Sequence, residues 1–224
     1  MINKNSTKEE VLEAVKQDGG ALEYAAEEFK NDRDFILEAV KQHWRAFLHA
    51  SNELKGDPQV VSIAMRKYSD AFFYASKKLK GERKFVMEAV KQNGSTLRYA
   101  SEELKRDREV VLEAVKQDGF ALRYASEKLR GDQEVVLEAV KQDGEALWFA
   151  SEELNRDREV VMEAVKQNGV ALRYAAEEFQ DDREVVMEVT KKDYSAFQYV
   201  SEELKKEMVD CWINAMEKEI KNDK

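Results

Sequence analysis

The stretch Val111–Val135, VLEAVKQDGFALRYASEKLRGDQEV, decides the fold, because its 25-residue pattern returns along the chain without insertion or deletion. A ninth copy starts at Cys211 and then departs from the pattern. A short fixed period predicts stacked units of secondary structure, none of which can bury its apolar face alone. The eight complete copies begin at Val11, Ile36, Val61, Val86, Val111, Val136, Val161 and Val186.

Each copy contains two sets of apolar residues with helical spacing. Counted from the first residue of the copy, one set occupies positions 25, 1, 2, 4 and 5, and the other occupies positions 11, 12, 14, 15 and 19. Spacings of three and four residues place each set on one side of an amphipathic helix. A pair such as Asp118–Gly119 separates the sets in most copies and predicts a tight turn. Each copy is therefore predicted to be a helical hairpin.

Residues at the start of the first helix are typical of helix N-caps. Thr7 and Glu10 form a T-x-x-E pattern, which predicts a capping box. The single proline, Pro58, falls at the first helical position, where a missing N–H is tolerated. An acid occupies the cap position in the other copies, at Asp32, Asp57, Glu82, Asp107, Asp132, Asp157, Asp182 and Glu207.

These signals predict an all-α fold, a right- or left-handed α-solenoid of eight 25-residue helical hairpins with a capping helix. Residues 1–10 are expected to form an N-terminal cap. Residues 11–210 are expected to form the eight tandem repeats as a single elongated domain, and residues 211–224 the C-terminal capping helix.

Positions 9 and 12 vary together. Where position 9 is Gly, position 12 is Leu, as in Gly119 and Leu122. We infer that the side chains at the two positions share one packing site, which can be filled by either of two combinations of residues. In the three copies without this Gly, position 9 is Trp44, Ser69 or Tyr194, and position 12 is Phe47, Phe72 or Phe197.

The unit E-V-V-L-E-A-V-K-Q-N/D-G-x-A-L-x-Y-A-S-E-E-L closely resembles the repeats of the domain-of-unknown-function family 4116. The resemblance covers Val11–Asp210, and copies two, three and eight depart from it at the Gly. It implies a helical repeat module seen in bacteria and microbial eukaryotes. It implies no activity and identifies no catalytic residues.

Composition narrows the cellular setting. The segment MINKNST lacks the apolar core of a signal peptide, and no apolar run reaches 18 residues. With one Cys, the chain cannot form an internal disulfide, which favours a reducing compartment. We therefore expect a cytoplasmic protein with no membrane association, taken as a monomer, although a substrate of a specialised secretion system would have the same features.

Positions 10 and 13 vary most between copies, whereas positions 4, 11, 15 and 19 are nearly constant. They lie three residues apart on the second predicted helix and project together. Stacking would place them in a double column on the surface, called the variable column below. Its candidate protein-binding residues are Arg45, Leu48, Asp70, Phe73, Arg98, Phe120, Arg123, Glu145, Trp148, Val170, Arg173 and Gln198.

Large apolar residues and arginines share the variable column, and both are common anchors of protein interfaces. The predicted function is a non-enzymatic scaffold that binds a protein partner, acting as an inhibitor or effector by occluding the partner's surface. The formal net charge of −9 suggests that this partner is basic, for instance a nucleic-acid-handling protein. The competing interpretation is that the column is unconstrained and drifts.

Direct RNA or DNA binding is the second functional class, through Arg98, Arg123 and Arg173. The net negative charge disfavours it, because sequence-independent binding needs a basic surface. Tyr at position 14 of six copies could stack on unpaired bases. Its place among Ala and Leu predicts instead that the ring is buried in the core.

The sequence predicts no enzyme, no cofactor and no metal site. His43 and His49 are six residues apart and do not share a helix face, and no Cys lies near them. Cys211 lies among apolar residues and is expected to pack rather than react. Carboxylates repeat in nearly every copy, whereas a catalytic pair needs one special environment. No Gly-rich phosphate loop is present.

Overall fold

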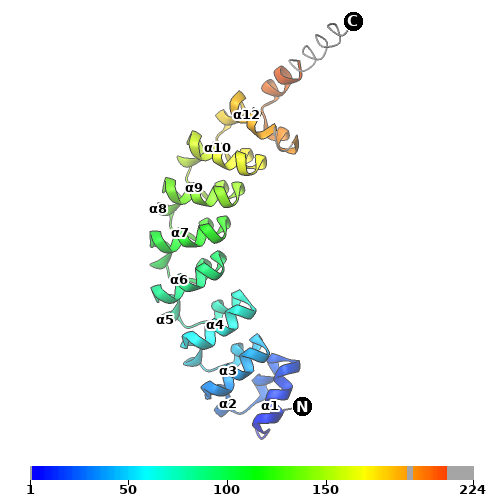
Figure 1. The fold of residues 1–224 in the computed structure, drawn as a ribbon, viewed down its shortest axis with the longest axis vertical. Coiled ribbons are helices and arrows are strands. Elements are labelled where there is room, and N and C mark those ends of the chain that lie inside the picture. Colours follow the sequence, from blue (N-terminus) through cyan, green and yellow to red (C-terminus); the bar gives the residue numbers. More distant parts are fainter. Residues whose placement is uncertain (1, 191–193, 211–224) are drawn as a thin grey trace. The chain divides into compact units, whose positions relative to one another are not determined.

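The computed structural model describes residues 2–190 and 194–210, and every regular element within them is a helix. The chain forms two compact units, Met1–Gln117 and Asp118–Lys224. Within each unit the long helices lie side by side in chain order, which is the repeated packing that the sequence predicts (Figure 1). The predicted capping helix, with Cys211, lies outside the described residues.

A long α-helix opens each copy. It begins three residues before the copy and, in copies one to seven, ends at position 7. The side chains at positions 25, 1, 4 and 5, such as Val110, Val111, Ala114 and Val115, are fully buried. The long helices are α1 (Lys8–Gln17), α3 (Arg33–Gln42), α4 (Pro58–Lys67), α6 (Arg83–Gln92), α7 (Arg108–Gln117), α9 (Gln133–Gln142), α10 (Arg158–Gln167) and α12 (Arg183–Thr190).

The prediction of one continuous second helix is wrong. In its place, each copy has a 3₁₀ helix over positions 9–14, followed after two or four residues by a short helix. The 3₁₀ helices are η1 (Gly19–Tyr24), η2 (Trp44–His49), η4 (Ser69–Tyr74), η5 (Gly94–Tyr99), η7 (Gly119–Tyr124), η8 (Gly144–Phe149), η10 (Gly169–Tyr174) and η11 (Tyr194–Tyr199).

The short helix alternates between two forms along the chain. In copies one, three, five and seven it is an α-helix, and in copies two, four and six it is a single 3₁₀ turn. Residues 202–210 are helical in copy eight. The short helices are α2 (Glu27–Asn31), η3 (Leu54–Gly56), α5 (Lys77–Lys80), η6 (Leu104–Arg106), α8 (Glu127–Arg130), η9 (Leu154–Arg156) and α11 (Glu177–Gln180).

Backbone hydrogen bonds between copies explain why the second helix is interrupted. The residue at position 16 donates its N–H to the carbonyl at position 20 of the preceding copy, as Ser76 does to Lys55 over 2.8 Å. A continuous α-helix would use that N–H internally, so the bond between copies competes with the helix. Ser76 is accordingly extended, with φ −60° and ψ 151°. The same bond joins Ser51 to Lys30, Ser101 to Lys80, Ser151 to Arg130, Ala176 to Asn155 and Ser201 to Gln180.

Gly at position 9 permits close packing between copies. No glycine among the described residues has a positive φ, so a left-handed backbone is not the reason for it. A Cβ on Gly144 would lie 2.4 Å from the carbonyl oxygen of Ala164 in the next long helix. Trp44, which replaces this Gly in copy two, instead stacks on Tyr68 with ring centroids 4.5 Å apart. That positions 9 and 12 share one packing site stays a prediction.

The helix starts match the sequence signals with two exceptions. Thr7 and Glu10 form the capping box, and Pro58 is the first residue of α4. Glu82 accepts no capping hydrogen bond through its side chain, and Glu207 lies within helix 202–210 rather than before it, so neither is the predicted cap. The acids that do cap their helices are Asp32, Asp57, Asp107, Asp132, Asp157 and Asp182.

Candidate functional site

The variable column lies on the 3₁₀ helices. Because a 3₁₀ helix has three residues per turn, side chains at positions 10 and 13 are eclipsed and project in the same direction. In the first unit η1 packs on η2 and η4 on η5, and in the second η7 packs on η8, η8 on η10 and η10 on η11. The column residues of neighbouring copies are thereby brought together inside each unit.

In copies one, two and four to seven, the side chain at position 8 fixes the start of the 3₁₀ helix over positions 9–14. This side chain accepts a hydrogen bond from the backbone N–H at position 10, as Asp118 does from Phe120 and Asp143 does from Glu145. Such an acceptor compensates for the missing helical partner of that N–H. His43 performs this role in copy two, where its Nδ1 accepts from the N–H of Arg45 at 3.2 Å.

None of the twelve candidate residues is buried. Phe73 is 55% exposed and Trp148 is 62% exposed, which are unusually high values for side chains of this size. Arg45, Arg123, Arg173 and Gln198 are also exposed. The half-buried members of the column are Leu48, Asp70, Arg98, Phe120, Glu145 and Val170.

In the first unit, the column of copies three and four forms one connected cluster. Arg98 makes an ion pair with Asp70 of the preceding copy and lies over the ring of Tyr99, 4.4 Å from its centroid. Phe73 packs edge-on against Tyr74 and Tyr99, with centroid separations of 5.0 and 5.6 Å. In copy two of the same unit, the guanidinium group of Arg45 lies 5.9 Å from the centroid of the Trp44 ring.

In the second unit, aromatic residues of one copy contact those of the next. Phe120 packs edge-on against Phe149 at 5.9 Å, and Trp148 lies against Tyr174 at 5.0 Å. The guanidinium group of Arg173 also lies over the Tyr174 ring, 4.4 Å from its centroid. These contacts hold the exposed rings in place, so each presents a defined surface at little further cost in side-chain entropy.

Polar contacts bring Glu145 into the same cluster. Its carboxylate accepts from the Tyr174 hydroxyl at 3.3 Å and from the Asn168 side-chain amide at 3.2 Å. Partial burial raises the pKa of the Tyr174 hydroxyl; Arg173 counteracts this rise and Glu145 adds to it. Tyr174 therefore remains a hydrogen-bond donor at neutral pH.

The prediction that the Tyr rings at position 14 are buried is wrong. Tyr24 is 62% exposed and Tyr74 is 42% exposed, and Tyr99, Tyr124 and Tyr174 are half-buried. The error follows from treating positions 9–19 as one α-helix, because the 3₁₀ helix turns position 14 towards the edge of the column. The dipeptide Arg-Tyr in copies four, five and seven was a sequence signal that these Tyr rings are accessible. In each of these copies the Arg lies over the ring of the Tyr that follows it.

The two histidines lie in different environments. His43 is engaged in capping, and burial lowers the pKa of the half-buried His49. Over residues 2–190 and 194–210, no group of three or more His, Cys, Asp or Glu side chains is arranged to hold a metal ion. In the same part of the chain, no helix has both the length and the apolar character needed to cross a membrane.

Comparison with known families agrees with the repeat analysis. The model of a family described as Domain of unknown function (DUF4116) matches residues 7–55, 57–105, 107–155 and 157–205. Each match spans two 25-residue copies, which is also the period at which the short helix alternates between its two forms. No curated protein and no solved structure matches the chain.

Proposed function

The chain belongs to the DUF4116 family, and we propose that it is a non-enzymatic scaffold that binds a protein partner through the variable column. The observation that carries the proposal is the exposure of Phe73 and Trp148, which are held by neighbouring rings rather than covered by them. Exposed, preorganised aromatic side chains are the groups that contribute most to protein interfaces. In this proposal the copies stack as an α-solenoid of eight units, and a monomer acts in the cytoplasm.

The mode of action in this proposal is occupancy. The column offers aromatic anchors flanked by charged and polar groups, which is the usual arrangement of an interface core and its rim. Binding would cover the partner's surface and so inhibit or redirect the partner. Nothing in this mechanism requires a reaction, a cofactor or a metal.

Nucleic-acid binding through Arg98, Arg123 and Arg173 is the alternative that the test must separate. Two of these guanidinium groups already have anionic or hydroxyl partners, since Arg98 pairs with Asp70 and Arg123 donates to the Tyr124 hydroxyl. The third, Arg173, lies over the ring of Tyr174. A phosphate would have to displace them. The formal net charge of −9 also opposes the approach of a polyanion.

The test is affinity capture from lysate with the wild-type chain and with a Phe73→Ser, Phe120→Ser, Trp148→Ser triple variant. Met187→Ser is the matched control, because Met187 is a large apolar side chain, 50% exposed, on α12 and away from the column. Circular dichroism establishes that all three proteins are equally helical. We expect a protein band that the triple variant loses and the control retains.

Equal capture by the wild type and the triple variant would overturn the proposal. Nucleic acid that co-purifies with the wild type, and is lost on changing Arg98, Arg123 and Arg173 to Glu, would establish the alternative instead.

A further inference from the structure

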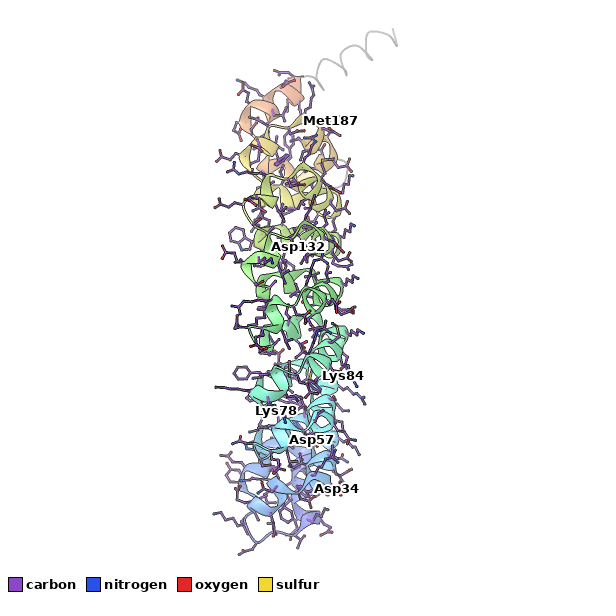
Figure 2. The ribbon with its side chains drawn as sticks, turned by 90° about the vertical axis from the view of Figure 1, so that its left-hand side faces the viewer. Asp34, Asp57, Lys78, Lys84, Asp132 and Met187 are labelled. Atoms are coloured by element: carbon purple, nitrogen blue, oxygen red, sulfur yellow. The ribbon has the colours of Figure 1, made fainter. Side chains whose placement is uncertain are left out.

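Copy three, residues 61–85, has a charge opposite to that of the chain as a whole. It contains seven Lys and Arg against two Asp and Glu, whereas the whole chain has a formal net charge of −9. The excess is concentrated at Lys77 and Lys78 on α5 and at Lys84 on α6. Figure 2 shows Lys78 and Lys84 on these neighbouring elements of the first unit.

Comparison with the other copies shows how local this change is. Position 17 and position 18 are each Glu in six of the other seven copies, and position 24 is acidic in five of them. In copy four, for example, the same positions hold Glu102, Glu103 and Glu109. Copy three thus replaces acidic positions with three lysines while keeping the apolar pattern of the repeat.

The three lysines are free to receive a ligand. Lys77, Lys78 and Lys84 are exposed, and no carboxylate of the described residues lies within 4.0 Å of any of their ammonium groups. Lys80 and Arg83 are different, because Lys80 donates to the carbonyl of Phe73 at 2.6 Å and Arg83 pairs with Asp107 at 2.6 Å. Because these three cations have no carboxylate partner, they create a positive surface potential, which favours the binding of an anionic partner.

The same copy also presents exposed aromatic rings. Phe73 and Tyr74 are 55% and 42% exposed, and Tyr74 precedes Lys77 by three residues in the chain. The ammonium of Lys80 lies 5.4 Å from the centroid of the Phe73 ring. Burial lowers the pKa of Lys80, and repulsion from the nearby Lys77 ammonium lowers it further.

We propose that Phe73, Tyr74, Lys77, Lys78 and Lys84 form a basic patch that binds an acidic polypeptide segment carrying a large apolar side chain. The apolar side chain packs on the exposed rings, and the acidic groups pair with the lysines. The inference rests on the proposed function, because Phe73 belongs to the variable column. It also refines that function, since the partner is acidic here rather than basic as the net charge suggests.

The geometry favours a polypeptide over single-stranded nucleic acid. Phe73 meets Tyr74 and Tyr99 edge-on, so the rings form a compact knob rather than a row of open faces for base stacking. The excess positive charge is confined to one copy, because copy four has as many acids as bases. One copy spans about 10 Å of packed helix, which suits a short peptide better than a strand that needs a continuous basic track.

The test is fluorescence anisotropy with a fluorescein-labelled peptide of sequence EDELFDELDE, using the full chain. The diagnostic variant is Lys77→Glu, Lys78→Glu, Lys84→Glu, which gives copy three the residues of copy four. It is expected to fold, because Glu at position 17 can pair with Lys80 as Glu102 does with Lys105 at 2.8 Å. The charge-matched control is Lys41→Glu, Lys116→Glu, Lys141→Glu, three exposed lysines of long helices.

We expect the diagnostic variant to weaken peptide binding by about tenfold or more, the control by less than about threefold, and added salt to weaken wild-type binding. Equal affinity of the diagnostic variant and the control would overturn the inference. So would tighter binding of a labelled thymidine 20-mer, or of phosphatidylserine vesicles, than of the peptide.

The two proposals fail separately. Loss of lysate capture in the column variant, together with no peptide binding, would overturn only the acidic partner. Peptide binding that depends on the lysines, together with equal lysate capture, would overturn only the wider role of the column.

Discussion

Asp70 and Arg98, at positions 10 and 13 of successive copies, form an ion pair that joins copies three and four. Their side chains are 32% and 29% exposed, so the pair is partly shielded from water. Arg98 also covers the ring of Tyr99, which Phe73 contacts from another side. The residues that vary in the column are therefore coupled to one another across copies, and a change at one position alters the support of the next.

A double-mutant cycle measures that coupling. We expect Asp70→Ala and Arg98→Ala to show a coupling energy of about 0.5–1 kcal/mol, as is usual for partly exposed ion pairs. The measurement is urea unfolding of both single variants and the double variant. Additive single effects would mean that the ion pair contributes nothing to stability.

Replacing Gly144 tests the reason for glycine at position 9. We expect Gly144→Ala to destabilise the chain by about 1–3 kcal/mol, because the new methyl group would meet the Ala164 carbonyl oxygen at 2.4 Å. Gly131→Ala is the control in the same unit, since its Cβ would make only ordinary van der Waals contacts, the nearest with the Ser151 hydroxyl at 3.5 Å and the Lys128 carbonyl oxygen at 3.6 Å. A negative φ at Gly131 makes that substitution neutral or stabilising by about 0.5 kcal/mol. Equal urea midpoints for the two variants would contradict the close-packing explanation.

Acid should weaken the contacts between long helices. Hydrogen bonds from Arg83 lower the pKa of the Asp107 carboxyl, and Arg158 does the same for Asp182. Because their folded-state pKa values lie below the unfolded value of about 3.9, these groups contribute stability above that pH and lose it as the pH falls through the folded-state values.

The measurement is the urea midpoint as a function of pH, for the wild type and for Arg83→Gln, Arg158→Gln. We expect the wild-type midpoint to fall more steeply than that of the variant below about pH 4. The Asp143 carboxyl has the opposite effect on the pH dependence of stability, because burial raises its pKa in the folded state. Parallel curves for the two proteins would show that the Arg–Asp pairs do not govern acid stability.

Much of the repeat could be read from the sequence because its signals are local. The spacing of Val111, Ala114 and Val115 identifies the buried side of the long helix, and Asp107 identifies its start. Such features depend on the propensity and periodicity of a few neighbouring residues. Repetition strengthens them, since eight copies vary the surface while the core stays the same.

The interruption of the second helix could not be read in the same way. It depends on a hydrogen bond from the Ser76 N–H to the Lys55 carbonyl. The two residues are 21 positions apart, so no pattern among neighbouring residues predicts this bond. Because the second helix was taken as continuous, Tyr74 and Tyr99 were predicted to lie in the core, whereas Tyr74 is exposed and Tyr99 is half-buried. The pairing of Asp70 with Arg98 was hidden for the same reason, because it joins different copies.

Leu147 and Trp148, neighbours on η8, separate the stability of the fold from the function of the column. Leu147 is fully buried, so we expect Leu147→Ala to cost about 2–5 kcal/mol. Trp148 is 62% exposed and touches Tyr174, so Trp148→Ala should cost about 1 kcal/mol or less. Thermal unfolding monitored by circular dichroism gives both values. If Trp148→Ala proved as destabilising as Leu147→Ala, the indole would be part of the core, and its loss could not report on partner binding.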